Sequence, residues 1–299
     1  MRVRSPRNWQ RFTLPAKVFH LLGLFLLRRP FGQQIALFCR AVSSIFSKNR
    51  SLKADSRNII MQTFFTAVEI FPILFVVATL FGAVTIIEVL SMMSKMGFAD
   101  FVGNMIVVVV IRELGPILTA FLIAGRSGSS LTAYIGSMVI NYEVDALATM
   151  GVNPIRFLVM PSLIGGCIAM LIMNVFFSAS AICGGFILTK CEIFMSGMSG
   201  VMQSEMSNIQ LTWSYLSDEI LKAITLEDFI FLILKPLVFG AIITTNACYQ
   251  ALNIPRDVRQ VPKAVSRSVI KSFLYIVVAD VIISIFYLVD YMNNLNQLI

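Results

Sequence analysis

The sequence predicts an all-α integral membrane protein with about five transmembrane helices, preceded by an N-terminal amphipathic helix in the membrane interface. Of its 299 residues, 57% are hydrophobic and 13% are charged, whereas a soluble domain carries about 25% charged residues. A helix crosses the hydrocarbon with about 20 mostly apolar residues, and five segments are that long. Their apolar cores are Ile70–Leu90, Met105–Ala124, Pro161–Leu188, Phe229–Cys248 and Ser272–Val289, which predict spans over about 70–90, 105–135, 161–188, 229–250 and 269–289.

Charge divides the chain into two units. Residues 1–57, which include the amphipathic helix, hold twelve Lys or Arg and one acidic residue, Asp55, and residues 58–299 form the five-helix membrane domain. Because Lys and Arg are retained in cytoplasmic loops, we expect the N-terminus and the connections 137–160 and 251–271 in the cytoplasm. The connections 91–104 and 189–228 and the C-terminus then face the opposite side. A basic segment directly before a span favours anionic lipid over nucleic acid as its partner.

The residues after Pro30 predict the amphipathic helix. Apolar side chains recur at helical spacing (Phe31, Ile35, Phe38, Val42 and Ile45), and polar ones fill the other side (Gln34, Arg40, Ser43, Ser44 and Ser47). Such a helix lies in the cytoplasmic headgroup plane or, as the alternative, packs on the bundle. The scarcity of acids before Asp55 also fits an organellar transit peptide. A cleaved signal peptide is not expected, because Arg28-Arg29-Pro30 follows the first apolar run.

The residue inventory excludes several classes of enzyme. His20 is the single histidine, and the five cysteines form no C-x-x-C pair, so we predict no catalytic residue and no metal site. No phosphate-binding G-x-x-x-x-G-K-[ST] loop occurs, so we predict no cofactor in this chain. Uphill transport would draw its energy from another polypeptide or from an ion gradient.

Arg112 and Glu113 lie near the middle of the second predicted span, where ionisable residues are costly and indicate function. Pro116 lacks an amide donor and clashes with the carbonyl of Arg112, so a kink is expected beside the charges. These features predict a cavity that admits water or a polar headgroup. The alternative is an internal salt bridge to Glu88, Lys235 or Asp280 that holds the bundle together.

Two further segments have residue patterns that predict close helix packing and a short helix. Small residues from Gly125 to Gly136, with Gly125, Arg126 and Gly128 first, predict close helix packing, either within the chain or at a dimer seam. Residues 141–154 predict a short cytoplasmic helix, capped by Asn141 and ended by a left-handed Gly151 before Pro154. Its acids, Glu143 and Asp145, suit the helix N-terminus, and its apolar edge is Val144, Leu147 and Ala148. This helix is either a docking element for a soluble motor or an ordinary loop helix.

Three blocks of this sequence resemble the signature of the MlaE/YrbE-type permeases, the membrane subunits of ABC transporters that work with MCE proteins. The blocks are Arg112–Gly128, Thr132–Met138 and Val144–Pro154, and the chain near Ala247–Leu252, Ala264–Ile270 and Asp280 is similar to the last two helices of that family. The resemblance covers residues 58–290. Glu88, where the family often has a neutral polar residue, the extension 1–30 and the acidic, Met-rich 189–228 connection depart from it.

The resemblance implies an ABC permease that moves phospholipid or a related lipid and contributes to outer-membrane lipid asymmetry. Its partners would be a second copy in a homodimer, a cytoplasmic ABC ATPase that holds ATP and Mg²⁺, and a periplasmic MCE-domain protein. The chain would be a multi-pass protein of the bacterial inner membrane, with its N-terminus in the cytoplasm and its C-terminus in the periplasm. An organellar inner membrane stays open as the host.

The resemblance also implies site residues. The 143–154 segment would be the ATPase-coupling helix, with Glu143, Asp145, Leu147, Met150, Gly151 and Pro154. A lipid cavity would be lined by Thr85, Glu88, Met92, Met93 and Met96, facing Arg112, Glu113 and Leu114. The methionines suit varied acyl chains. ATP binding by the partner would close the coupling helices and squeeze this cavity.

Two other classes remain open at this stage. A gradient-driven secondary transporter would use Glu113, Glu88 and Asp280 as proton sites, although five spans without an internal repeat argue against it. A membrane scaffold without transport activity would carry no bound lipid.

Overall fold

A computed structural model describes residues 30–45, 52–97, 101–197 and 213–298, and within these ranges the chain is built of helices and short connections. Five helical stretches are long and apolar enough to cross a membrane: Phe71–Met93, Val102–Ile140, Ile155–Leu188, Asp228–Leu252 and Val258–Tyr287. The predicted all-α class with five spans is therefore confirmed. The expectations for residues 1–29 and for the 198–212 part of the connection before the fourth span lie outside the described residues.

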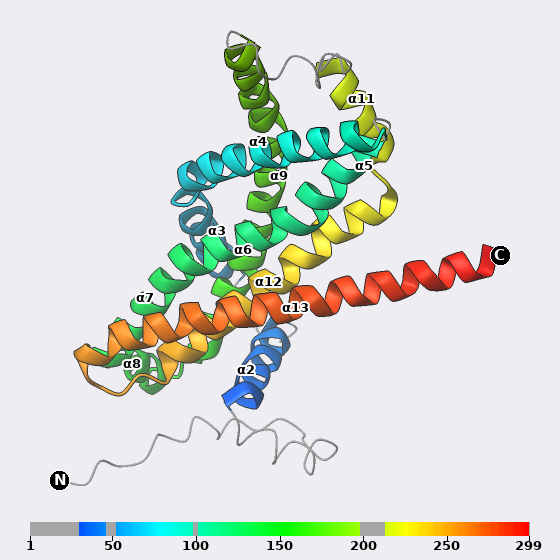
Figure 1. Cartoon of the computed structure of the whole chain (residues 1–299). Helices are drawn as coiled ribbons and strands as arrows, with labels where there is room; N and C mark the ends of the chain where they lie inside the picture. Colours follow the sequence, from blue (N-terminus) through cyan, green and yellow to red (C-terminus); the bar gives the residue numbers. More distant parts are fainter. Residues whose placement is uncertain (1–29, 46–51, 98–100, 198–212, 299) are drawn as a thin grey trace.

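Figure 1 shows the described helices in the order of the chain. Two helices precede the first span, α2 (Pro30–Ile45) and α3 (Leu52–Val68), and the first span is α4 (Phe71–Met96). The second span consists of α5 (Val102–Ile106), η3 (Val107–Leu114), α6 (Gly115–Ile123), η4 (Ala124–Gly128) and α7 (Ser129–Ile140). The remainder comprises α8 (Glu143–Thr149), η5 (Ile155–Val159), α9 (Met160–Gly197), α11 (Trp213–Ala223), α12 (Leu226–Leu252), η6 (Val258–Gln260) and α13 (Val261–Leu298). Of these, η3, η4 and η5 are π-helical and η6 is a 3₁₀ turn.

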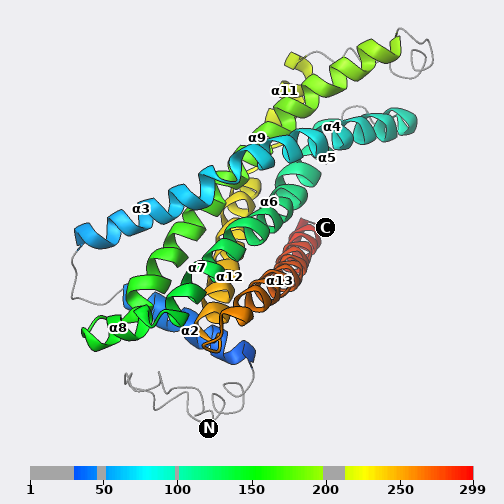
Figure 2. The same ribbon diagram turned by 90° about the vertical axis from the view of Figure 1, so that its left-hand side faces the viewer.

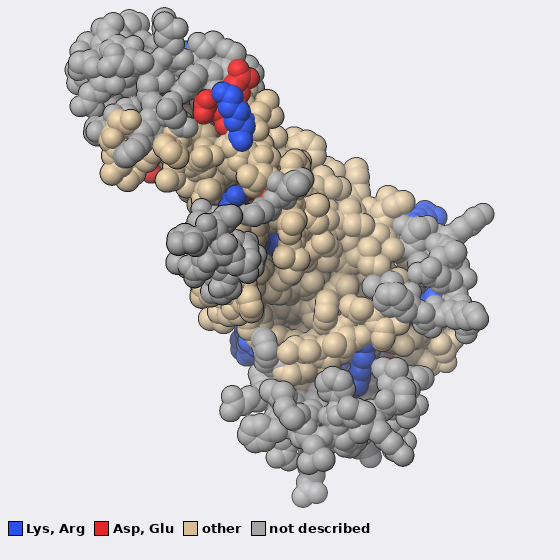
Figure 3. All heavy atoms as spheres, turned by 90° about the vertical axis from the view of Figure 1, so that its right-hand side faces the viewer, with Lys and Arg blue, Asp and Glu red and all other residues tan. Residues whose placement is uncertain are grey.

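The bundle has two distinct ends. Figure 2 shows α8, α2 and the start of α13 at one end, and α11 with the last turns of α9 and α4 at the other. The connections that were predicted to share the cytoplasm, 137–160 and 251–271, lie at the same end. On the face in Figure 3, charged side chains gather toward the ends and edges of the described surface, and the broad middle is uncharged. An uncharged middle suits a hydrocarbon environment.

The helices α4 and α9 pack through their backbones. A Cβ atom on Gly82 would lie 2.0 Å from the carbonyl oxygen of Ala181, and one on Gly185 would lie 2.5 Å from the carbonyl carbon of Gly82. A Cβ atom on Gly184 would lie 2.6 Å from the hydroxyl oxygen of Thr79. Small residues let helices approach closely in lipid, where no hydrophobic drive brings them together. This seam between the first and third spans was not predicted from the sequence.

The helix α2 packs on the bundle, which is the alternative that its pattern left open. The amide of Gln34 is buried and donates from Nε2 to Oδ1 of Asn246 at 3.0 Å, and the hydroxyl of Tyr249 donates to Oε1 of Gln33 at 2.6 Å. The assignment of Gln34 to the solvated side is wrong, because a tertiary amide partner makes its burial favourable. Ile35, on the predicted apolar face, is half exposed.

Candidate functional site

The second span is irregular where its charges lie. Pro116 offers no amide to the carbonyl of Arg112, and the chain responds with the π-helical segment η3, in which the Gly115 amide donates to the carbonyl oxygen of Val110. The freed carbonyl oxygen of Arg112 accepts instead from Nζ of Lys235 on α12, at 3.0 Å. At the place where a kink was expected, the structure has π-helical turns with a replacement donor.

In the fourth span, too, a side chain donates to a carbonyl that a proline leaves without its usual donor. Pro236 lies inside α12 and removes the usual donor for the carbonyl of Leu232. Nδ2 of Asn174, on α9, donates to that carbonyl at 3.4 Å. In both spans a polar side chain of a neighbouring helix satisfies the backbone group that proline frees, as the absence of water in the bilayer requires.

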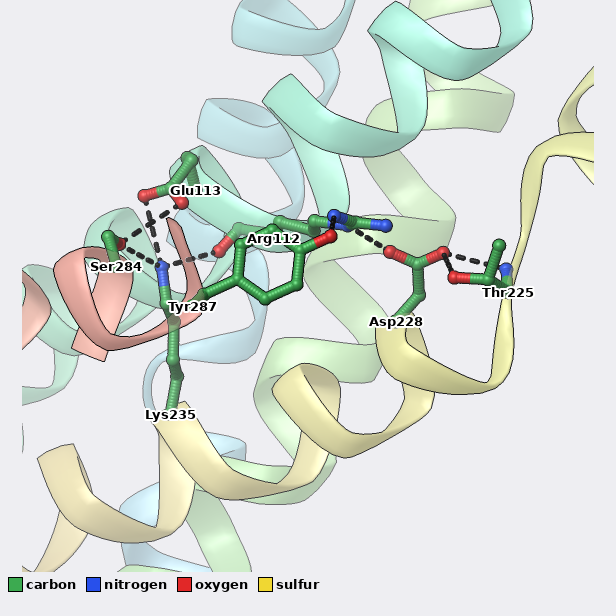
Figure 4. A network of polar contacts seen from close by, with 7 residues as sticks. All are labelled: Arg112, Glu113, Thr225, Asp228, Lys235, Ser284 and Tyr287. Atoms are coloured by element: carbon green, nitrogen blue, oxygen red, sulfur yellow. Dashed lines mark hydrogen bonds and ion pairs between the residues drawn. The ribbon is translucent and has the colours of Figure 1, made fainter. Parts of the chain in front are cut away.

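Lys235 is the centre of a polar network that joins three helices (Figure 4). Its side chain is 1% exposed, and Nζ lies 3.0 Å from Oε2 of Glu113, 3.0 Å from Oδ1 of Asp280 and 3.2 Å from Oγ of Ser284. The Ser284 hydroxyl in turn donates to Oε1 of Glu113 at 3.3 Å. A buried ammonium requires this kind of neutralisation, because an unpaired charge inside a protein costs several kcal/mol.

Arg112 belongs to the other half of the network. Its guanidinium forms an ion pair with Asp228 at the start of α12, and Nη1 donates to the Tyr287 hydroxyl at 2.7 Å. The guanidinium carbon also lies 5.1 Å from the centroid of the Tyr287 ring. Asp228 accepts from the Thr225 amide and hydroxyl, at 2.7 and 2.9 Å. One carboxylate thus caps α12 and holds Arg112.

The neighbours Arg112 and Glu113 therefore bind different partners rather than each other, as their positions about 100° apart on a helix require. Of the three salt-bridge partners that the sequence suggested, Lys235 and Asp280 are in the network. No hydrogen bond or ion pair among the described residues joins Glu88 to it. Sequence reasoning missed Asp228, Ser284 and Tyr287. Asp228 was counted among the acids of the 189–228 connection, although it is the third residue of α12 and the first residue of the fourth span.

The predicted first-span lining is divided between two faces of α4. Thr85 and Met93 are 7% exposed, and the Thr85 hydroxyl donates to the Phe81 carbonyl. Glu88, Met92 and Met96 follow one another at intervals of four residues on an exposed face. Leu114 is partly exposed, and the Glu113 side chain is 41% exposed. Only this second group is placed to meet a molecule outside the subunit.

The predicted packing residues also differ in their surroundings. Gly128 is buried, and a Cβ atom there would lie 3.2 Å from the Ile243 side chain of α12, so its contact is within the chain. A Cβ atom on Gly125 would meet nothing within 4 Å. Arg126 is exposed, with Nε 3.6 Å from Oε2 of Glu69.

The short helix α8 is ended by a Schellman turn. Gly151 has φ +79°, the Val152 amide donates to the Leu147 carbonyl at 3.0 Å, and the Gly151 amide donates to the Ala148 carbonyl at 3.2 Å. These are the two hydrogen bonds that define the motif, so the predicted left-handed stop at Gly151 is confirmed. Pro154 follows as the residue before η5.

The start of α8 differs from the prediction. Asn141 ends α7, and Tyr142, in the left-handed region at φ 63°, precedes α8. The Asn141 amide reaches the Glu143 carboxylate rather than the backbone of the first turn, so the predicted cap is wrong. Val144 is buried against Met138 and Leu158. Leu147 and Asp145 are partly buried, Glu143 is exposed and Met150 is 76% exposed, which leaves an outward face on this helix.

The described residues contain no cluster of three or more His, Cys, Asp or Glu side chains that could hold a metal ion. The charged network is therefore a set of hydrogen bonds and ion pairs between helices. It joins the second span to α12 and α13 within the hydrophobic part of the bundle.

Comparison with known proteins gives the family. The family model of the permease MlaE matches residues 59–286. The chain belongs to the MlaE permease family. The match begins in α3 and ends at residue 286, one residue before the end of the fifth span, and it includes α8 and the charged network except Tyr287.

Individual relatives agree with the family. The chain is 26% identical to a probable ABC transporter permease protein of Rickettsia prowazekii, over 90% of this chain and 96% of the relative. A probable ABC transporter permease protein of Porphyra purpurea is 29% identical over 76% and 80% of the two chains. The chloroplastic protein trigalactosyldiacylglycerol 1 of Arabidopsis thaliana is 24% identical over 79% of this chain and 63% of its own length. This MlaE-family chain is a multi-pass membrane permease subunit of an ABC transporter.

Proposed function

We propose that this permease subunit moves phospholipid or a related lipid between the inner membrane and a periplasmic MCE protein, driven by a separate ATPase. The observation that carries the proposal is the family match over residues 59–286. The name of the plant relative contains the name of a galactolipid, which supports a lipid as cargo. The ABC class is favoured over a gradient-driven carrier, because the relatives from Rickettsia prowazekii and Porphyra purpurea are named as probable ABC transporter permeases.

The proposed assembly is a homodimer above two copies of a cytoplasmic ABC ATPase, with ATP and Mg²⁺ bound by the ATPase. The outward face of α8, with Glu143 and Met150 exposed, supports its role as the coupling helix. The connection to α13 and the first turn of α13 lie at the same end and carry basic residues (Arg256, Arg259 and Lys263), as cytoplasmic connections do. We therefore place the N-terminus in the cytoplasm and the C-terminus in the periplasm of a bacterial inner membrane.

The proposed lipid path follows the exposed members of the predicted cavity. Glu88, Met92 and Met96 would form one wall, and the second span near Glu113 and Leu114 would form the other. Thr85 and Met93, being buried, would support the first wall from behind. Flexible methionines suit acyl chains of different shapes.

Arg112 has a conditional role in this path. Its guanidinium is neutralised by Asp228, so it can bind a lipid phosphate only by exchanging that partner. We propose that closure of the coupling helices, driven by ATP binding in the partner, squeezes the cavity and loosens this ion pair. The ion pair with Lys235 would fix the position of Glu113. Whether this ion pair stays closed would decide whether the π-helical segment η3 can move.

The test is affinity purification of the full chain in mild detergent, with mass spectrometry of the co-eluting proteins and lipids. We expect an ABC ATPase, an MCE-domain protein and bound lipid. Arg112→Gln and Glu113→Gln should lower co-purified lipid, whereas Lys222→Gln, which removes an exposed charge on α11, should not. Purification without an ATPase and without lipid would overturn the proposal.

A further inference from the structure

One side chain joins α8 to the connection between the last two spans. Arg256 follows α12 by four residues, and its guanidinium forms an ion pair with Asp145 of α8. The same guanidinium carbon lies 4.2 Å from the centroid of the Tyr142 ring. Arg256 therefore contacts both the residue before α8 and its first turn.

Tyr142 is a second, independent sign that this contact matters. It is the one non-glycine residue with positive φ in the described part of the chain. For a bulky side chain this backbone conformation is a true outlier. The arginine stacked on its ring is a partner that favours this conformation, through the attraction between a cation and an aromatic face.

The connection that Arg256 occupies leads directly to the charged network. The helix α12 supplies Asp228 and Lys235, and α13 supplies Asp280, Ser284 and Tyr287. The residues that bind the Arg112 and Glu113 side chains thus belong to the α12–α13 hairpin, residues 226–298: Asp228, Lys235, Ser284 and Tyr287. The ion pair of Arg256 with Asp145 attaches one end of the hairpin to α8. Further along, the hairpin binds the π-helical segment of the second span through Lys235 and Asp228.

We propose that Arg256 is a positioning residue that makes the α12–α13 hairpin move together with α8. This inference rests on the proposed function, in which α8 receives the movement of an ATPase. Displacement of α8 then reaches Lys235 and Asp228 through the hairpin, in addition to reaching the second span directly through α7. Arg256 contributes to the coupling of hydrolysis with transport, and little to folding, because partly exposed ion pairs add little to stability.

The experiment uses the full chain reconstituted in proteoliposomes with the ATPase that co-purifies with it, and measures ATP hydrolysis and lipid transfer in the same samples. Arg256→Gln should leave ATPase binding and the melting temperature unchanged. Lipid transferred per ATP should fall at least about fivefold, the lower end of ordinary coupling between sites. Arg259→Gln is the matched control, because Arg259 is an exposed arginine of the same connection and its backbone amide makes the contact with Asp257.

A charge swap gives the readout that a merely structural role would not produce. Asp145→Arg alone and Arg256→Asp alone should both uncouple, whereas the double variant should regain most of the transfer per ATP. If Arg256→Gln fails to accumulate, Asp145→Asn removes the same ion pair and decides by the same comparison with Arg259→Gln.

The outcomes separate this inference from the proposed function. If the unaltered complex hydrolyses ATP and transfers no lipid, the proposed function is overturned. If the unaltered complex transfers lipid, and Arg256→Gln and the charge-swapped variants couple as well as Arg259→Gln does, the role of Arg256 is overturned and the proposed function stands.

Discussion

Two helix contacts in this bundle are built on opposite principles. The helices α4 and α9 meet backbone to backbone, at Gly82, Ala181 and Gly185. The second span meets the α12–α13 hairpin through the charged side chains of Arg112, Glu113 and Lys235. Two helices in backbone contact fit closely together in one relative position. Hydrogen-bonded ion pairs, in contrast, can exchange partners. The comparison indicates a rigid α4–α9 unit against which the hairpin and the second span can rearrange.

The largest expected loss of stability comes from breaking the charged contact at its centre. Lys235→Met leaves Glu113 and Asp280 without their common counter-ion and the Arg112 carbonyl without a donor. We expect a loss of about 3–5 kcal/mol in the free energy of unfolding, as for one partner removed from a buried pair. Denaturant unfolding of the purified subunit measures it. Lys222→Met, which breaks an exposed pair with Glu219, should cost at most about 1 kcal/mol, and equal losses would contradict the assignment.

Breaking the glycine contact should have a smaller but clear effect. Gly82→Ala places a methyl group 2.0 Å from the Ala181 carbonyl oxygen, so the helices must separate, at a cost of about 1–3 kcal/mol. Gly125→Ala is the control in the same kind of membrane helix. Its new methyl group meets nothing within 4 Å, and replacing a helical glycine by alanine stabilises a helix by about 0.5–1 kcal/mol. Equal melting temperatures of the two variants would contradict a close backbone contact at Gly82.

The smallest effect should loosen the charged contact without breaking it. Thr225→Ala removes the hydroxyl that donates to Asp228 at 2.9 Å and should cost about 1 kcal/mol, as for other helix caps. Hydrogen exchange should become faster in the first turn of α12 and stay unchanged in α4 and α9. Ser266→Ala, an exposed hydroxyl on α13 that donates to the Pro262 carbonyl, should change neither. Faster exchange throughout the bundle would show that the two contacts are not independent.

Much of the fold could be predicted, because hydropathy alone reports which segments cross a membrane. The five spans and the left-handed Gly151 depend on local properties of the chain, as does the loss of the amide donor at Pro116. The π-helical form of η3 could not be predicted. It requires Lys235, more than a hundred residues away in sequence, to supply the donor that Pro116 removes.

Part of the site could be predicted, because some of its residues stand out in the local sequence. Arg112, Glu113, Lys235 and Asp280 are conspicuous because a charge in an apolar segment is rare. Ser284 and Tyr287 are ordinary residues of a membrane helix until the fold brings them to Glu113 and Arg112. The α4–α9 seam was missed because its glycines are far apart in sequence, at positions 82 and 185, and resemble other small residues of the spans. Close packing is a property of the pair of helices rather than of either one.

The most direct test of the central claim is lipid transfer by the reconstituted complex of this chain and its ATPase under two energy sources. We expect transfer that requires ATP hydrolysis and continues when the proton gradient is collapsed. Transfer that proceeds on a proton gradient without ATP would contradict the account, because Glu113 and Asp280 would then act as proton carriers rather than as the grip of the hairpin on the second span.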